Sequence, residues 1–119
     1  MRFWLDRGAD GFRLDVINFI SKDQAFPDSS ESVNSGFEYY ACGPRLHEYL
    51  KGLGDILKEY DAFSVGEMPC VTDTKEVIKA VGGDRGELSM IFNFEMYVQF
   101  MLNSKTTISS LLAKLTQKY

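Results

Sequence analysis

The segment GFRLDV at residues 11–16 has the features of a short buried β-strand, because it is rich in aromatic and branched side chains and begins at a glycine. Two further segments have the same character, FSVGE at residues 63–67 and SMIFNF at residues 89–94. Between the first two strands, leucines recur at helical spacing and predict a helix over residues 45–60. The stripe consists of Leu46, Leu50, Leu53, Leu57 and Tyr60.

Two more helices follow from the same periodicity. Val77, Ile78 and Val81 indicate a helix that ends at residues 82–83, with Asp73 as N-cap and Glu76 completing a capping box. A third helix is predicted toward the C-terminus, capped by Thr106 or Thr107. Its apolar positions are Ile108, Leu111, Leu112 and Leu115. Strands that alternate with helices predict an α/β fold with a parallel sheet and right-handed crossovers.

Residues 22–43 interrupt this alternation, because they are rich in serine, aspartate and glycine and poor in aliphatic side chains. The composition predicts a long loop after the first strand. Loops of more than about 15 residues inside a compact domain are uncommon and are often functional. In parallel α/β folds, the loops after the carboxyl ends of strands bind ligands, so this loop is predicted to border the functional site.

Three acidic residues fall at or just beyond the carboxyl ends of the predicted strands, namely Asp15, Glu67 and Glu95. Parallel strands end at the same edge of a sheet, so Asp15 and Glu67 are expected to be neighbours although one crossover separates them in sequence. Two carboxyl groups in one cleft can act as nucleophile and general acid/base. The alternative is that each is a helix cap or a solvated loop acid.

Composition excludes several other classes of protein. The 119 residues are 45% hydrophobic and 25% charged, which is typical of a soluble globular domain. Thirteen scattered basic residues against 17 acidic ones argue against a nucleic-acid partner. Cys42 and Cys70 lack metal-ligand spacing, and no phosphate loop, dinucleotide-binding turn or nucleophile elbow is present, so no metal or cofactor is expected. No apolar run approaches membrane-spanning length, and residues 1–10 lack signal-peptide features, so a cytoplasmic location without membrane contact is expected.

The acidic strand ends also carry a family resemblance. GFRLD at residues 11–15 resembles the nucleophile motif of glycoside hydrolase family 13, the α-amylase family, and VGEMP at residues 65–69 resembles its acid/base motif. The similarity extends to FWLDRG (3–8), DVIN (15–18) and FNFE (92–95), and is strongest to the oligo-1,6-glucosidase and maltase branch. The resemblance implies a (β/α)8 barrel whose fourth to sixth strands are the three predicted here. Because a whole barrel needs about 250 residues, residues 1–119 are expected to be its central part, truncated at both ends.

The resemblance also implies roles for individual residues. Asp15 matches the nucleophile and Glu67 the acid/base of a retaining glycosidase. Arg13 lies two residues before Asp15, so strand alternation directs both side chains to one face, and it matches the arginine that keeps the nucleophile ionised. Val16 matches a position that is associated with α-1,6 specificity, and it is equally well interpreted as a core valine. Glu95 is expected to be a supporting or structural residue.

Other residues are interpreted as structural. His47 is expected to be solvated or to cap its helix, and Cys70 to be buried and inert. Met90, Phe92 and Phe94 are expected to be core residues, with an aromatic platform near the sugar as the alternative.

The sequence thus predicts an α-glucosidase acting on terminal α-1,4 or α-1,6 bonds of short oligosaccharides. The alternatives are a trehalose-6-phosphate hydrolase, a sucrose-isomerising enzyme, or a non-catalytic barrel such as the heavy subunit of an amino-acid transporter. The parent protein is expected to be monomeric. Alone, the 119-residue chain is expected to be inactive and prone to association, because its sheet would have open edges.

Overall fold

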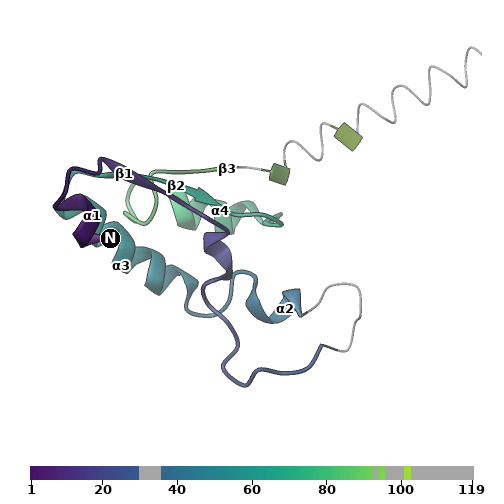
Figure 1. Ribbon diagram of the computed structural model, residues 1–119. Coiled ribbons are helices and arrows are strands. Elements are labelled where there is room, and N and C mark those ends of the chain that lie inside the picture. Colours follow the sequence, from purple (N-terminus) through teal and green to yellow (C-terminus); the bar gives the residue numbers. More distant parts are fainter. Residues whose placement is uncertain (30–35, 93, 96–100, 103–119) are drawn as a thin grey trace, which may run out of the picture.

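A computed structural model describes residues 1–29, 36–92, 94–95 and 101–102 of the chain (Figure 1). These residues form three strands and a set of helices that alternate with them, as predicted. In chain order the elements are α1 (Arg2–Leu5), β1 (Gly11–Leu14), the 3-10 helix η1 (Ile17–Phe19), α2 (Phe37–Tyr40), α3 (Leu46–Glu59), β2 (Phe63–Glu67), α4 (Thr74–Val81) and β3 (Met90–Phe92).

The strands form one parallel sheet in the order β1-β2-β3. Arg13 of β1 is in register with Val65 of β2, and Val65 is in register with Met90 of β3. Residues in register point to the same face of a sheet, and residues two apart on a strand share that face. The register therefore places Arg13 and Glu67 on one face, close to the edge where the strands end.

Helices α3 and α4 cover the opposite face of the sheet (Figure 1). Ser64 and Gly66 of β2 are buried on that side, whereas Met90 and Phe92 of β3 are exposed on the other. The expectation that Met90, Phe92 and Phe94 are core residues is therefore wrong for the described part of the chain. The core between sheet and helices contains Ile17, Leu46, Leu50, Met68, Val71, Ala80 and Leu88.

Helices α3 and α4 follow the predicted pattern with local differences. Leu46, Leu50 and Leu57 are buried, but Tyr60 lies after the end of α3, is exposed, and donates a hydrogen bond to Asp6 (2.7 Å). In α4 the buried residue is Ala80, whereas Ile78 is exposed. Asp73 caps α4 by accepting a hydrogen bond from the Lys75 amide.

The predicted capping box does not form, because the partners of Glu76 are the side chains of Lys79 and His47. The pKa of Glu76 is lowered first by Lys79 and then by His47.

Two strands are shorter than predicted. β1 ends at Leu14, because Val16 adopts a left-handed conformation (φ 35°, ψ 47°) that breaks the extended backbone. β3 ends at Phe92, and residues 94–95 are helical. The predicted long loop contains one helical turn, α2. The predicted C-terminal helix, from residue 106 or 107 onward, lies outside the described residues.

Two glycines of α3 provide a matched test of how this helix packs. A Cβ at Gly54 would collide with the carbonyl oxygen of Gly86 and lie 2.7 Å from that of Glu87, whereas a Cβ at Gly52 would meet nothing within 4 Å. In the protein that carries this chain, we expect Gly54→Ala to lower the free energy of unfolding by about 1–3 kcal/mol. Gly52→Ala is expected to raise it by up to about 1 kcal/mol. Denaturant unfolding measures both changes, and equal effects of the two substitutions would contradict this packing.

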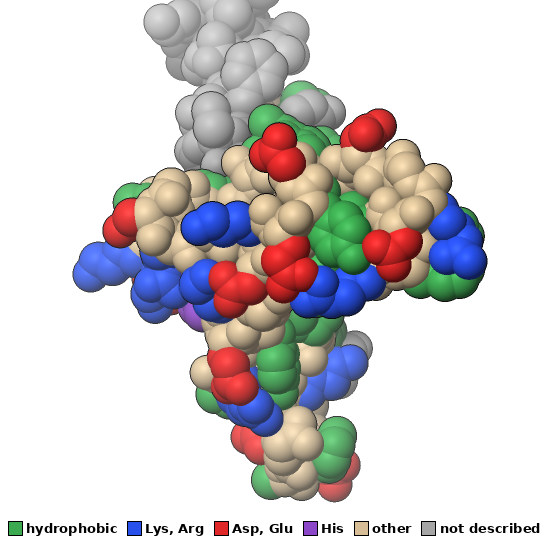
Figure 2. All heavy atoms as spheres, turned by 90° about the vertical axis from the view of Figure 1, so that its left-hand side faces the viewer, with side chains coloured by type: hydrophobic (Ala, Val, Ile, Leu, Met, Phe, Trp, Pro, Cys, Tyr) green, Lys and Arg blue, Asp and Glu red, His purple; other side chains and the backbone are tan. Residues whose placement is uncertain are grey.

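The surface near α1 carries both signs of charge. Lys and Arg side chains are interspersed there with Asp and Glu (Figure 2), and Arg2 forms an ion pair with Glu59 at the end of α3.

Among the described helices, none combines the length and the apolar character needed to cross a membrane.

Candidate active site

Arg13 connects the two carboxylates that the sequence places at neighbouring strand ends. Asp15 follows the last residue of β1, and Glu67 is the last residue of β2. The Arg13 guanidinium donates one hydrogen bond to Asp15 and another, of 2.5 Å, to Glu67 Oε2. The structure therefore brings Arg13, Asp15 and Glu67 together, as the strand register requires.

The two carboxylates have different surroundings. The side chain of Asp15 is 70% exposed, whereas that of Glu67 is 19% exposed. A hydrogen bond with the Glu67 carboxyl, followed by the hydrogen bond and positive charge of Arg13, lowers the pKa of Asp15 from its ordinary value of 3.8. Asp15 is ionised at neutral pH even at its ordinary pKa, and these contacts keep it ionised to lower pH. An ionised carboxylate beside a second carboxyl group is the arrangement that nucleophile and acid/base chemistry requires.

Val16 is the next residue after Asp15 and has a positive φ of 35°. A β-branched residue rarely adopts this conformation, which costs free energy and is found most often at functional sites. Here the turn points the Val16 amide at Glu67 Oε2, 3.4 Å away. Val16 thus contributes a backbone N–H beside the acid/base candidate, while its side chain is half-buried.

The long loop after β1 is fixed at both of its ends. Asn18 of η1 accepts a hydrogen bond from the Cys42 amide (2.9 Å), and the buried Ser21 hydroxyl accepts one from the Arg45 amide (2.9 Å). A Cβ at Gly43 would collide with the carbonyl oxygen of Ser21, so the two ends of the loop pass in direct contact. This closure holds the turn that carries Asp15 against the start of α3.

Comparison with known proteins identifies the family of this site. The pattern described as "Alpha amylase, catalytic domain" matches residues 1–119. The chain belongs to the α-amylase catalytic-domain family. The fold of that family is the TIM barrel, and the parallel sheet with its covering helices is part of such a barrel, which confirms the predicted fold class.

Individual relatives are similar over most of the chain. An α-glucosidase of Schizosaccharomyces pombe is 61% identical over 100 residues, which are 80% of this chain and 17% of the relative. An oligo-1,6-glucosidase of Parageobacillus thermoglucosidasius is 49% identical, over 80% of this chain and 18% of the relative. The crystal structure of trehalose-6-phosphate hydrolase from Bacillus licheniformis superposes with a TM-score of 0.70 at 46% identity, covering 79% of this chain and 17% of that one. The matched part of the chain thus spans about a sixth of the length of these relatives.

The structure also places His47, Cys70 and Glu95, and the first two of them differ from expectation. His47 is half-buried, with Nδ1 2.7 Å from Glu87 and Nε2 2.9 Å from Glu76, so it joins α3 to α4 and to the segment before β3. Cys70 is exposed and has a φ of 61°, so the expectation of inert burial is wrong. Glu95 lies three residues beyond β3 in a helical turn and is half-buried.

No sequence pattern predicted the contacts of His47, Glu87 or Asn18, because a lone polar residue in an apolar segment does not reveal its partner. Asn18 appears in the sequence only as the end of DVIN.

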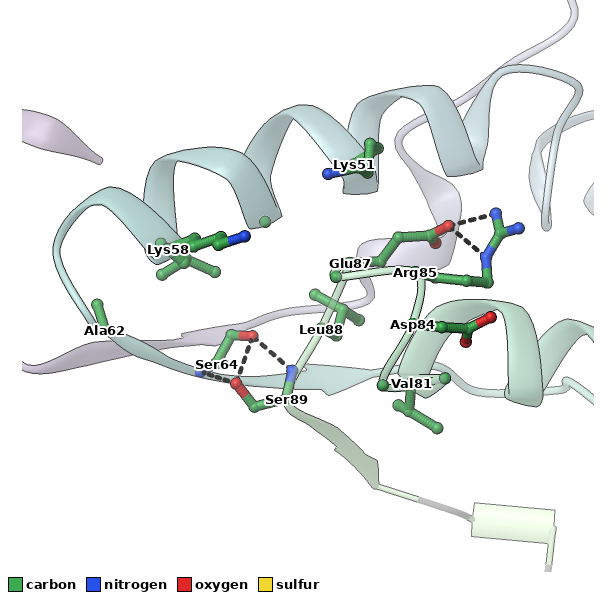
Figure 3. A pocket seen from close by; sticks show the side chains of 15 residues that line it. Lys51, Lys58, Ala62, Ser64, Val81, Asp84, Arg85, Glu87, Leu88 and Ser89 are labelled. Atoms are coloured by element: carbon green, nitrogen blue, oxygen red, sulfur yellow. Dashed lines mark hydrogen bonds and ion pairs between the residues drawn. The ribbon is translucent and has the colours of Figure 1, made fainter.

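A hollow lies away from the carboxylates, between α3 and the segment that joins α4 to β3 (Figure 3). It has a volume of about 480 Å³ and its lining includes Lys51, Ser64, Arg85 and Glu87. Arg85 is paired with Glu87, Lys51 with Asp55, and the Ser64 hydroxyl with the Ser89 amide. Chemistry is assigned to the strand-end carboxylates instead, because Lys51, Arg85 and Glu87 in this hollow are engaged in structural pairs.

Removing Arg13 tests its electrostatic role. In the full-length protein, Arg13→Leu is expected to lower kcat/KM roughly 10²- to 10³-fold, because a preorganised positive charge beside the reacting carboxylates is lost. The pKa of Asp15 should rise toward 3.8, so the acid limb of the pH–rate profile should move to higher pH. Arg7→Leu is the matched control, because Arg7 lies over the Phe3 ring and contacts neither carboxylate. An unchanged acid limb in Arg13→Leu would contradict this role.

Proposed function

We propose that the protein to which this chain belongs is a retaining α-glucosidase that hydrolyses terminal α-1,4 or α-1,6 bonds of short oligosaccharides. The observation that carries the proposal is the bridge from Arg13 to both Asp15 and Glu67, on neighbouring strand ends of an α-amylase-family chain. The relatives named α-glucosidase and oligo-1,6-glucosidase support this substrate class. In this proposal β1, β2 and β3 are the fourth, fifth and sixth strands of the barrel, and residues 1–119 are its central part.

The proposed reaction has two steps. Asp15 attacks the anomeric carbon while Glu67 donates its proton to the leaving oxygen, and a covalent glucosyl-enzyme forms. Glu67 then accepts a proton from water, which displaces Asp15 and releases glucose with retained configuration. This scheme needs carboxyl groups roughly 5–5.5 Å apart, a separation that one arginine contacting both can maintain. No metal or cofactor takes part in the proposed reaction.

Substrate specificity is the decisive test of the proposal. The full-length protein should release glucose from maltose, isomaltose or both, and proton NMR should show α-glucose as the first product. Preference for isomaltose would support a linkage role for Val16. Exclusive turnover of trehalose-6-phosphate would favour the alternative suggested by the B. licheniformis structure, and conversion of sucrose to an isomer would favour a sucrose-isomerising enzyme. Absence of turnover on every one of these substrates would favour a non-catalytic barrel, such as a transporter subunit.

The proposal also concerns the cellular location, the partners and the oligomeric state of the enzyme. We infer that it is a cytoplasmic monomer whose partner is its oligosaccharide, with neither nucleic acid nor membrane involved. The free thiols of Cys42 and Cys70 suit a reducing compartment. The 119-residue chain alone should be inactive and associate, because β1 and β3 are open edges of the described sheet and the face with Met90 and Phe92 is uncovered. Cell fractionation and size-exclusion chromatography test these points.

A further inference from the structure

Asn18 is a fully buried polar residue that connects the two halves of the active site. It lies three residues after Asp15, in η1, and its side chain has no exposed surface. Its Nδ2 donates a hydrogen bond of 2.9 Å to the carbonyl oxygen of Pro69, two residues after Glu67. One side chain therefore ties the turn that follows the nucleophile candidate to the segment that follows the acid/base candidate.

The orientation of the Asn18 amide follows from its partners. A carbonyl oxygen such as that of Pro69 only accepts hydrogen bonds, so the N–H side of the amide must face it. The Cys42 sulfur lies 3.9 Å from the same nitrogen, and Oδ1 finds no donor among the described residues. Burying an amide with half of its hydrogen-bonding capacity unused is unfavourable. Packing alone would be served better by an apolar side chain, so the polar side chain calls for another explanation.

The backbone of Asn18 adds a third connection. Its carbonyl oxygen accepts a hydrogen bond from the Cys42 amide, at the end of the long loop. Asn18 thus holds together three segments: the turn after β1, the segment after β2, and the residues just before α3. The parallel pairing of β1 with β2 ends at Leu14 and Gly66, before either carboxylate. Beyond that point Asn18–Pro69 is a direct tie between the two segments, besides the contacts of Glu67 with Arg13 and Val16.

We propose that Asn18 is a positioning residue that sets the separation of Asp15 and Glu67 by holding the Pro69 carbonyl. The inference rests on the proposed function, because it concerns the geometry of the same two carboxylates. A displacement of about 1 Å between reacting groups can lower a rate about 10²-fold without changing substrate contacts. Loss of the Asn18 N–H should therefore reduce kcat far more than it changes KM.

The experiment compares Asn18→Leu with Ser64→Ala in the full-length protein. Leucine has a similar size but no side-chain N–H. Ser64 is also fully buried and hydrogen-bonded, to the Ser89 amide (3.0 Å), but it lies on the face of the sheet opposite the carboxylates. Both variants should unfold at a lower temperature than the parent. Asn18→Leu alone should lower kcat about 10- to 100-fold with KM within about threefold, and should move the acid limb of the pH–rate profile upward, because Asp15 loses its close approach to Glu67.

The result that would overturn the proposal is a folded Asn18→Leu protein with the kcat and the acid limb of the parent. If that variant does not fold, Asn18→Asp replaces it and is judged by the same kcat and pH criteria, because aspartate keeps the shape and removes the N–H. Asp15→Asn, measured in parallel, distinguishes failure of the positioning role of Asn18 from failure of the proposed function. An inactive Asp15→Asn with a normal Asn18 variant rejects only the positioning role, whereas an active Asp15→Asn rejects the proposed function itself.

Discussion

Asp15→Asn in the full-length protein should lower kcat/KM for a terminal α-glucoside roughly 10⁴-fold or more, because the covalent intermediate cannot form. The fold should be unaffected, since the Asp15 side chain is 70% exposed and the amide has the same shape. In Asp15→Gly, which leaves an empty space where the carboxylate was, added azide should restore turnover of an aryl α-glucoside. Because azide attacks from the nucleophile side, the product identified by NMR should be the inverted β-glucosyl azide.

Asp61→Asn is the matched control for that experiment. Asp61 is an exposed turn residue before β2 with a φ of 51°, a conformation that asparagine adopts readily. It lies at the opposite end of the strand from Glu67, so the substitution should leave kcat/KM unchanged. Retention of wild-type activity by Asp15→Asn, or equal losses in the two variants, would show that Asp15 is not the nucleophile.

Glu67→Gln should produce a loss that depends on the leaving group. For maltose-type substrates, whose leaving alcohol needs a proton, kcat/KM should fall roughly 10²- to 10⁴-fold. For an aryl glucoside with an acidic phenol the first step should be nearly unaffected, and the glucosyl-enzyme should accumulate, since no base activates water. Azide should then release the α-glucosyl azide, the anomer opposite to that formed with Asp15→Gly.

Glu48→Gln is a suitable control, because Glu48 is an exposed residue of α3 whose partner is Arg45. It should behave like the parent on both substrates. If Glu67→Gln lost the same factor on the aryl glucoside as on maltose, and azide had no effect, Glu67 would not be the acid/base. The opposite anomers from the two active-site variants together fix which carboxylate lies on which side of the sugar.

The sequence was sufficient for the elements that repeat a local pattern. The leucine spacing of α3 and the three apolar runs determine the alternation of helix and strand, and the parallel sheet follows from it. Asp15, Glu67 and Arg13 could be placed together because strand ends and side-chain alternation are geometric consequences of that sheet. These predictions depend only on regularities that extend over several residues.

Other features depend on contacts between distant segments, which no local pattern encodes. The short β1 results from the left-handed Val16, a conformation disfavoured for valine. Gly54 lies inside a helical pattern, yet its role is set by the Gly86 carbonyl oxygen 32 positions later. Asn18 and His47 are polar residues whose partners cannot be predicted from the sequence. In the fold, Asn18 donates a hydrogen bond to the Pro69 carbonyl oxygen, and His47 contacts the carboxylates of Glu76 and Glu87.

The closure of the loop between residues 21 and 43 separates two kinds of evolutionary change. Because Asn18 contacts Cys42 and Ser21 contacts Arg45, the residues between can be replaced, or their number altered, while the turn that carries Asp15 stays where it is. Lengthening a flexible loop twofold costs only about 0.6 kcal/mol. Substitutions and changes of length in this loop can therefore accumulate during evolution without moving Arg13, Asp15 and Glu67 relative to one another.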